Sequence, residues 1–371
     1  MSSLDDKKWM TEALRLARLG EGLTRPNPPV GAVIVKGGKI IGRGYHRKAG
    51  GPHAEIYALR QAGSRALGAT LYVTLEPCSS WGFTPPCTDA ILAAGLNRVV
   101  CSVADPNPRH AGKGFTILRR AGVSVQCGVG AAEGTEILRP FTTFMTRSRP
   151  YLTVKLATSL DGRLADSAGC SRWISGPKAR VQVQGLRRRA DAVMVGAGTV
   201  IQDNPSLTPR PARGRKPYRI IVDAAGRVSP QSRVFTDDVA DCTILATTCR
   251  CPVRQREAYG KRGAQVIVLP AAGRGVSLGS LMKALHAKGI MHVVCEGGGV
   301  LVGSLLKAGL VDEMVMYVAP VILGGQGLAS VGSVTWALAK APRMTVVESC
   351  QVGDDVMIRL VGRARCRLPK W

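Results

Sequence analysis

Long apolar runs are missing from this chain of 371 residues. The longest ones, at residues 90–96 and 315–323, are far shorter than the roughly 20 residues that cross a bilayer. The N-terminal sequence Met-Ser-Ser-Leu-Asp-Asp-Lys-Lys is mostly polar and lacks the apolar core of a signal peptide. We therefore expect no membrane-spanning helix and a cytoplasmic location.

Cysteine is too sparse for a disulfide scaffold. The chain has 11 cysteines, an odd number spread over a length that can bury a core without cross-links. Apolar residues at 45% and charged residues at 20% are typical of a globular protein. We expect reduced thiols throughout, apart from those that bind a metal.

Acidic residues are scarce relative to basic ones, with 25 Asp and Glu against 51 Lys and Arg and a net charge of +26. Such an excess can indicate a nucleic-acid partner, because Lys and Arg neutralise phosphates. Here the basic residues are scattered, and aromatic residues, which would stack on bases, make up only 5% of the chain. We favour small anionic substrates over nucleic acid.

The length predicts about two domains. Strand and helix patterns alternate through both halves, which is typical of α/β domains. The polar stretch Arg147-Ser-Arg-Pro150 is the best linker candidate. We expect one domain over residues 1–149 and a second over residues 150–371.

The expected elements follow from hydrophobic periodicity. In the first domain we expect helices at 5–19, 53–62, 88–94, 114–121 and 135–146, the last interrupted at Pro140, and strands at 30–35, 40–44, 70–74, 98–102 and 123–127. In the second domain we expect helices at 178–188, 278–288 and 300–308, and strands at 151–156, 192–195, 219–222, 243–246, 265–269, 291–295, 313–319, 344–348 and 356–361.

The first domain contains a metal-binding pattern. His53-Ala-Glu55 begins one helix, and Cys78 and Cys87 follow a strand. Three N and S ligands leave a fourth tetrahedral position for water, as in catalytic zinc sites, and Glu55 is suited to move protons from that water to a departing amine. The pattern is typical of zinc deaminases that act on amino-substituted rings. The alternatives are residues that are near one another only in sequence, or a purely structural zinc.

The spacing of the two cysteines narrows the class of substrate that we expect. Deaminases of nucleic-acid bases usually place two residues between the cysteines, whereas here eight residues, Ser79 to Pro86, separate them. A longer insert forms an extra loop beside the metal, where a substrate substituent can be recognised.

Glycine-rich turns mark the second domain. Gly297-Gly-Gly299 follows an expected strand and precedes an apolar helix, so its backbone N–H groups are candidates to bind a cofactor phosphate. The segment lacks the dinucleotide-binding fingerprint, and a simple tight turn is equally compatible with it. Glu296, at the strand end, is a candidate functional residue or a capping carboxylate.

Taken together, these motifs resemble the bifunctional deaminase–reductases of riboflavin biosynthesis. The matching stretches run nearly end to end: Asn27-Pro-Pro-Val-Gly-Ala-Val, His53-Ala-Glu, Tyr72-Val-Thr-Leu-Glu-Pro-Cys78, Thr84-Pro-Pro-Cys87, Ala104-Asp-Pro-Asn-Pro108, Lys155-Leu-Ala-Thr-Ser-Leu-Asp-Gly162, Trp173-Ile-Ser, Asp203-Asn-Pro-Ser-Leu-Thr208 and Glu296-Gly-Gly-Gly299.

The resemblance implies a cytidine-deaminase-like three-layer α/β domain followed by a dihydrofolate-reductase-like α/β domain, which together bind zinc and NADPH. It implies zinc-dependent deamination of a phosphoribosylamino-pyrimidine, then reduction of its ribosyl group to a ribityl chain. It also leads us to expect a homo-oligomer.

The resemblance further assigns site residues. It places Glu55 as catalytic residue, zinc on His53, Cys78 and Cys87, and deaminase substrate contacts at Asn27, His46, Asp105 and Asn107. Cofactor contacts fall on Ala157, Trp173, Thr199, Asp203 and a turn formed by Gly298, Gly299, Val300, Leu301, Val302, Gly303 and Ser304. Reductase substrate contacts fall on Lys155, Ser171, Ser175, Arg187, Leu207, Arg210 and Glu296, with Arg187 and Arg210 suited to clamp a phosphate.

One loop departs from the family pattern. The family normally has His at the position of Ser80 and a basic residue at that of Phe83, which would help to hold an anionic substrate. A first alternative is therefore an enzyme that works only as a reductase, with an impaired or retuned deaminase domain. A second alternative is an RNA-base deaminase, against which the long cysteine insert and the second domain both argue.

Overall fold

The computed structural model describes residues 3–81, 85–108, 110–211 and 215–362. By its internal contacts the chain divides into two compact units, Met1–Ser148 (unit 1) and Arg149–Trp371 (unit 2). None of the described helices combines the length and the apolar character needed to cross a membrane.

Unit 1 is a mixed sheet between two layers of helices. The strands are β1 (Gly31–Lys36), β2 (Lys39–Tyr45), β3 (Thr70–Leu75), β4 (Arg98–Val103) and β5 (Ser124–Cys127), in the order β2-β1-β3-β4-β5. β2, β1 and β3 pair antiparallel, while β3, β4 and β5 are parallel. The helices are α1 (Ser3–Arg18), α2 (Ala54–Ala62), α3 (Cys87–Ala93), α4 (Lys113–Arg120) and α5 (Ala131–Arg147).

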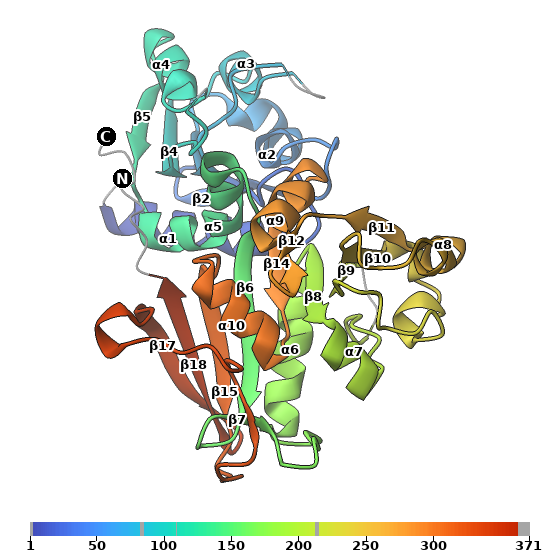
Figure 1. Cartoon of the computed structure of the whole chain (residues 1–371). Helices are drawn as coiled ribbons and strands as arrows, with labels where there is room; N and C mark the ends of the chain where they lie inside the picture. The colour runs from blue at the N-terminus through green and yellow to red at the C-terminus, as the bar shows by residue number, and fades with distance from the viewer. Residues whose placement is uncertain (1–2, 82–84, 109, 212–214, 363–371) are drawn as a thin grey trace. The chain divides into compact units, whose positions relative to one another are not determined.

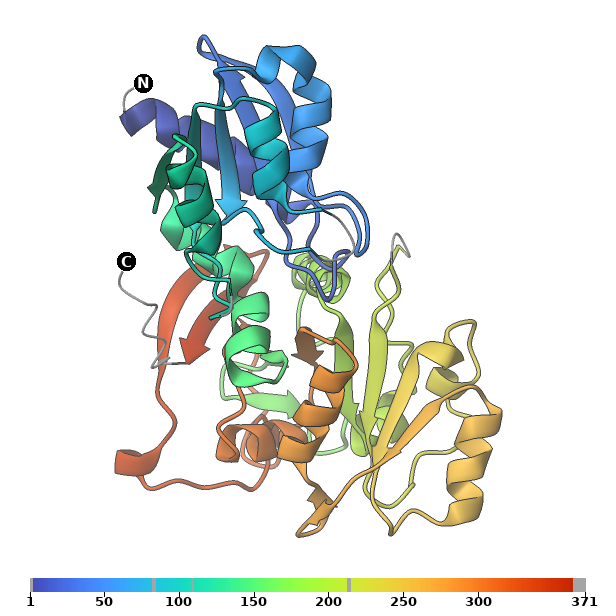
Figure 2. The same cartoon turned by 90° about the horizontal axis from the view of Figure 1, so that it is seen from above.

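The three layers follow from the two-residue period of the strands. Val33, Val35 and Val100 pack on one face with residues of α1 and α5. Their neighbours Ile34 and Val99 pack on the other face with α2, α3 and α4. Figure 2 shows α1, in dark blue, and α2, in lighter blue, on opposite sides of the strands.

Unit 2 is built on a nine-stranded sheet in the order β11-β10-β9-β8-β14-β6-β15-β18-β17 (Figure 1). Its strands are β6 (Tyr151–Thr158), β8 (Ala192–Gly196), β9 (Tyr218–Val222), β10 (Thr243–Thr247), β11 (Gln265–Val268), β14 (His292–Cys295), β15 (Glu313–Val318), β17 (Met344–Val352) and β18 (Asp355–Gly362). β15, β18 and β17 pair antiparallel, and the other pairs are parallel.

Helices cover both faces of this sheet. α9 (Leu278–Ala287) and α10 (Gly299–Lys307) pack on one face. α6 (Pro177–Arg189), α7 (Ala197–Asp203) and α8 (Val253–Lys261) pack on the other. Two small pairs, β7 (Arg163–Ala165) with β16 (Leu328–Ala329) and β12 (Ala271–Ala272) with β13 (Gly275–Val276), complete the described strands.

The expected elements are confirmed apart from one error in α5, and two helices and the four short strands β7, β12, β13 and β16 were not predicted. α5 continues through Pro140, so the predicted interruption is wrong. Ile137, Leu138 and Phe141 bury one side of α5, and this packing outweighs the cost of about 3 kcal/mol that an internal proline carries. The helices α7 and α8 were not predicted.

Candidate functional site

The three predicted metal ligands converge in unit 1. His53 precedes α2, Cys78 follows β3, and Cys87 is the first residue of α3. Their ligand atoms all lie within 4.8 Å of one another. The Nδ1 atom of His53 is 3.2 Å from Sγ of Cys87 and 3.5 Å from Sγ of Cys78.

These separations fit a zinc ion. Tetrahedral zinc lies about 2.05 Å from nitrogen and about 2.3 Å from sulfur, which places nitrogen and sulfur ligands about 3.6 Å apart. Hydrogen bonds from Cys87 and His53 lower the pKa of Cys78, which favours the thiolate that zinc requires. The residues present therefore fit the metal that the sequence predicts.

Glu55 lies in the first turn of α2, directly beside the ligands. Its side chain is 3% exposed, and its Oε2 atom has no hydrogen-bond partner among the described residues. Burial and the charge of Cys78 raise the pKa of Glu55. A buried carboxylate oxygen without a partner is costly, so this atom fits a position that water or substrate occupies.

Asn27 and His46 adjoin the same centre. The His46 ring is 5.3 Å from the His53 ring, and burial lowers the pKa of His46, which favours the neutral form. The Pro52 carbonyl oxygen, 3.0 Å from Nδ1, can only accept, so Nδ1 carries the proton. Nε2 is then left to accept from the Asn27 side-chain amide at 3.2 Å.

Asp105 and Asn107 belong to a turn between β4 and α4. The Asp105 carboxylate accepts the N–H of Asn107 at 2.8 Å. Burial raises the pKa of Asp105, and the N–H of Asp105 donates at 3.1 Å to Glu76, two residues before Cys78. Ser80 lies 3.5 Å from Nδ1 of His110, while Phe83 lies outside the described residues.

In unit 2 three predicted residues, Lys155, Arg187 and Glu296, form a charge cluster that is largely but not fully buried. Both oxygens of Glu296 accept from Arg187, at 2.6 and 2.7 Å. Burial acts to raise the pKa of Glu296, but the charge and hydrogen bonds of Arg187 outweigh it, with a contribution from Lys155, and the pKa is lowered. Burial lowers the pKa of Lys155, on β6. Arg187 is thus engaged by Glu296, whereas Arg210 is exposed.

The predicted cofactor residues are only partly brought together. A Cβ at Gly298 would lie 3.4 Å from Oγ1 of Thr199, so this hydroxyl faces the glycine segment. The segment itself is not a turn, because Gly299 to Ser304 form the start of α10. Gly297 has φ of +107°, a conformation that glycine adopts readily.

The side chains of several predicted contacts point elsewhere. Leu301 and Val302 belong to the hydrophobic core, as does Leu207, so their side chains are not available to a ligand. The N–H groups of Leu301 and Val302 both donate to the Gly298 carbonyl. Trp173 is 68% exposed and stacks on Arg180, with the guanidinium carbon 4.4 Å from the ring centre.

The remaining predicted residues lie on β6, at the end of α7 and just before α6. Asp203 ends α7, and its carbonyl accepts from Arg172. Ala157 lies on β6. Ser171 and Ser175 precede α6, and the carbonyl of Ser175 accepts from Arg180 at 2.6 Å.

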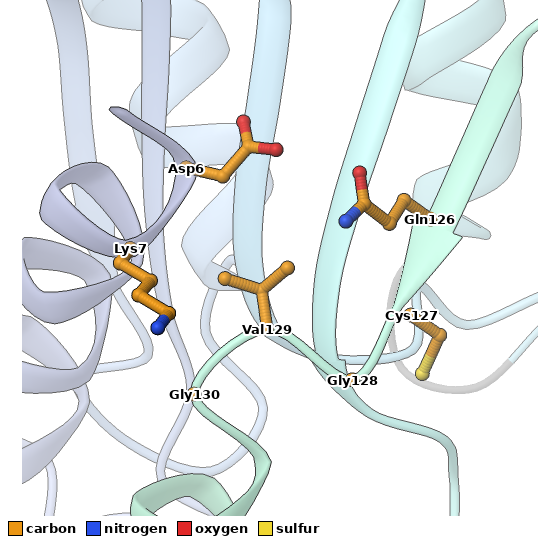
Figure 3. A pocket seen from close by; sticks show the side chains of 7 residues that line it. All are labelled: Asp6, Lys7, Gln126, Cys127, Gly128, Val129 and Gly130. Carbon is orange, nitrogen blue, oxygen red and sulfur yellow. The ribbon is translucent and has the colours of Figure 1, made fainter. Parts of the chain in front are cut away.

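A pocket in unit 1 shares no residue with the metal centre. Figure 3 shows it between α1, the end of β5 and the segment that leads into α5, lined by Asp6, Lys7, Gln126, Cys127, Gly128, Val129 and Gly130. The Asp6 carboxylate is bound by Arg98 at 2.7 and 2.9 Å and by Tyr72 at 2.8 Å. These contacts tie α1 to the sheet and indicate a structural role.

Sequence reasoning missed Glu76. Its buried carboxylate accepts four backbone N–H groups from the segment that carries Asp105. The one signal available in the sequence is its place between a buried strand and a metal ligand, which does not reveal these distant partners.

The comparisons with known proteins identify both units. Residues 3–103 match the family described as the cytidine and deoxycytidylate deaminase zinc-binding region, and residues 150–358 match the RibD C-terminal domain. The chain is 44% identical to riboflavin biosynthesis protein RibD of Aquifex aeolicus, over 95% of this chain and 97% of that protein. It is 41% identical to RibD of Escherichia coli, over 97% and 100%.

Solved structures agree along the whole chain. Acinetobacter baumannii RibD superposes with a TM-score of 0.88 at 37% identity, over 98% of this chain and 100% of that one. The Thermotoga maritima diaminohydroxyphosphoribosylaminopyrimidine deaminase/5-amino-6-(5-phosphoribosylamino)uracil reductase gives 0.87 at 34% identity, over 97% and 99%. The predicted fold class is confirmed, and the alternative of a reductase alone is not favoured. This chain belongs to the RibD family and is a deaminase and reductase of riboflavin biosynthesis.

Proposed function

We propose that unit 1 deaminates 2,5-diamino-6-(5-phosphoribosylamino)pyrimidin-4-one and that unit 2 reduces the ribosyl group of the product to a ribityl chain with NADPH. The name of the Thermotoga maritima relative contains both activities. The observation that carries the proposal is the convergence of His53, Cys78 and Cys87 beside the unpartnered oxygen of Glu55.

In the deaminase site the protein supplies ligands, proton transfer and orientation. His53, Cys78 and Cys87 would hold the zinc ion, which when bound would supply hydroxide at neutral pH by lowering the pKa of water to about 7. Glu55 accepts a proton from the attacking water and delivers it to the amino nitrogen, which leaves as ammonia. The Oε2 atom is suited to this because no described group occupies it.

Asn27, His46, Asp105 and Asn107 orient the substrate in this proposal. Neutral His46 fixes the Asn27 side chain through its Nε2 atom, so that the Asn27 carbonyl is left available to a ring N–H. The Asp105–Asn107 turn contributes further polar groups close to the ligands. Orientation of this kind lowers the entropic cost of reaching the transition state.

In the reductase site NADPH, when bound, would supply the hydride for the anomeric carbon of the ribosyl group, while the bond from that carbon to the ring oxygen breaks and the oxygen takes up a proton. Lys155, Glu296 and Arg187 are the buried polar groups nearest to this chemistry in the proposal. The protein's contribution is orientation and charge placement. Thr199 and the amides at the start of α10 bind the cofactor phosphate, and exposed Arg210 contacts the substrate phosphate.

An assay without NADPH tests the deaminase half. Ammonia release from the phosphoribosylated diaminopyrimidine is measured together with zinc content by atomic absorption. We expect ammonia release by protein that carries one zinc per chain. Zinc-replete protein that releases no ammonia would contradict the proposal and support an enzyme that works only as a reductase.

We also propose that the protein forms a homo-oligomer through β17. This strand is the last of the nine, pairs with β18, and is exposed from Thr345 to Gln351. Val346 and Val347 are 58% and 41% exposed, and an exposed apolar edge strand is prone to pair with another chain. Light scattering tests this: we expect a dimer or larger species that Val346→Lys shifts toward monomer.

We propose further that the protein works in the cytoplasm. Cys101 and Cys127 are directly paired in the β4–β5 register, yet both are free thiols. Reduced neighbours of this kind fit a reducing compartment. Thiol titration of protein purified without reductant should find them unmodified.

A further inference from the structure

The carboxylate of Glu76 is an unusual buried charge. The side chain is 5% exposed and lies between β3 and the metal ligand Cys78. Among the described residues no Lys or Arg lies within ion-pair distance of it. Hydrogen bonds must offset the free-energy cost of burying a carboxylate without a cation. The groups that donate these bonds are therefore the ones that Glu76 holds in place.

All the hydrogen bonds found for this side chain come from one segment. Oε2 accepts the N–H of Asp105 at 3.1 Å and of Gly112 at 2.9 Å. Oε1 accepts the N–H of Gly114 at 2.9 Å and of Phe115 at 3.4 Å. One carboxylate thus fastens Asp105 at one end and Phe115 at the other, and we call the described residues between these ends, 105–108 and 110–115, the clamped segment.

Close packing fixes the position of the clamped segment relative to the metal ligand Cys78. A Cβ on Gly114 would clash with the carbonyl oxygen of Pro77, the residue between Glu76 and Cys78. Gly112, just before α4, has φ of +77°, a conformation that favours glycine. A shift of the Glu76 side chain would therefore move the clamped segment relative to the metal centre.

The clamped segment carries two of the residues that the sequence predicts as substrate contacts, Asp105 and Asn107. The Asp105 side chain orders the following turn through the N–H of Asn107. The carbonyl of Asn107 in turn accepts the N–H of His110, whose ring lies 3.5 Å from Ser80 in the loop between the cysteines. The segment thus runs from beside the metal ligands to the insert that we expect to recognise the substrate.

We propose that Glu76 is a positioning residue of the deaminase site, which holds the clamped segment where its side chains bind the phosphoribosylated pyrimidine. This inference rests on the proposed deaminase function. Glu76 touches neither metal nor substrate and acts through Asp105, Asn107 and His110. Its contribution falls on substrate binding, because its carboxylate bonds to the clamped segment, whereas His53 and Glu55 are held by the start of α2 and Cys87 by α3.

The test is Glu76→Gln in the full-length, zinc-loaded protein, assayed for ammonia release without NADPH. An amide has one acceptor oxygen, and its NH₂ group opposes the backbone N–H groups that the second carboxylate oxygen binds. We expect KM to rise about 10-fold or more, the effect of about 1.4 kcal/mol, while kcat changes less than about 3-fold. Zinc content and reductase activity should stay at wild-type levels.

A second readout does not depend on activity. Hydrogen–deuterium exchange should become faster in the peptide that spans Asp105–Phe115 and stay unchanged in β2, the edge strand that β1 separates from β3. Glu133→Gln is the matched control, because Glu133 is an exposed carboxylate of the same unit, with 54% of its side chain accessible. It should leave KM and exchange unchanged.

The outcomes separate the possibilities. An unchanged KM in Glu76→Gln overturns the proposal, and so does a loss of kcat together with zinc, which would make Glu76 a support of the metal ligands. If Glu76→Gln does not fold, Glu76→Asp, which keeps the charge but shortens the side chain, is judged by the same criteria. Zinc-replete wild type that releases no ammonia would contradict the proposed function instead, and faster exchange in the variant would still support the clamp.

Discussion

Buried charges distinguish the residues of the two reactive centres. In unit 1 the Oε2 atom of Glu55 has no hydrogen-bond partner in the described part of the chain, which suits a group that must bind water or substrate. In unit 2 Glu296 is fully paired with Arg187 and lies near Lys155. The arrangement around Glu55 favours proton transfer. The arrangement around Glu296 holds charged side chains in fixed positions.

The Glu296 pair gives a prediction for stability. Glu296→Gln leaves the Arg187 guanidinium buried without its carboxylate, and removing one partner of a buried pair costs about 3–5 kcal/mol. Urea denaturation of the variant should show a decrease of that size in the free energy of unfolding. Glu133→Gln, whose side chain is 54% exposed and lies 4.0 Å from Arg18, is the control and should cost less than about 1 kcal/mol. A similar small cost for both variants would show that Arg187 does not need its partner.

Asp6 gives a prediction for pH dependence. Hydrogen bonds from Arg98 lower the pKa of Asp6 below its unfolded value of 3.8, although burial opposes them. The unfolded state therefore binds the proton first as pH falls, so the stabilisation is present above about pH 4 and is lost as pH falls through the lower, folded pKa. At pH 6 Asp6→Asn should be less stable by about 1.5–3 kcal/mol, the range for hydrogen bonds to charged groups.

The measurement is thermal or urea unfolding of both proteins between pH 2.5 and pH 6. The gap between wild type and Asp6→Asn should narrow toward the acid end, where the wild-type carboxyl is also neutral. A gap of constant size at every pH would mean that the charge of Asp6 does not contribute.

At the scale of elements, hydrophobic periodicity predicted those helices and strands that bury a regular face. α8 was missed because Tyr259 is its single buried residue, so the sequence shows no apolar stripe. α7 was missed because it begins Ala-Gly-Thr after another glycine, a composition typical of a turn. α5 was misjudged at Pro140, since tertiary packing, which no local pattern reveals, decides whether a helix continues.

The same limit applies to the site. His53, Cys78, Cys87 and Glu55 were predictable because their chemistry requires fixed residue types at short spacing. Glu76 was not, because its partners are backbone amides 29 to 39 positions later. The family pattern also assigned contacts to Leu207 and Val302, whose side chains the fold places in the core.

α10 gives a prediction at this scale. A Cβ on Gly303 would clash with the carbonyl oxygen of Val331, so Gly303→Ala should displace the helix whose first amides we propose bind the cofactor phosphate. We expect a loss of about 1–3 kcal/mol in stability and a higher KM for NADPH. Gly260→Ala in α8, where nothing lies within 4 Å of the added Cβ, is the control and should change neither. An unchanged KM in Gly303→Ala would argue against this role of α10.

At the scale of the whole molecule, each unit has its own hydrophobic core and its own reactive residues. The net charge of +26 suits two sites that both receive a phosphorylated substrate, since a positive field raises the local concentration of anions. Because the reactive groups belong to separate units, the two activities should be separable by single substitutions.

Glu55→Gln tests the central claim most directly. The full-length variant is assayed for ammonia release without NADPH, and for NADPH oxidation when the deaminated intermediate is supplied. We predict that ammonia release falls by roughly 10²–10⁴-fold, the usual contribution of a general acid–base group, while zinc content and NADPH oxidation are unchanged. Ammonia release at the wild-type rate would contradict the assignment of Glu55 and with it the proposed deaminase mechanism.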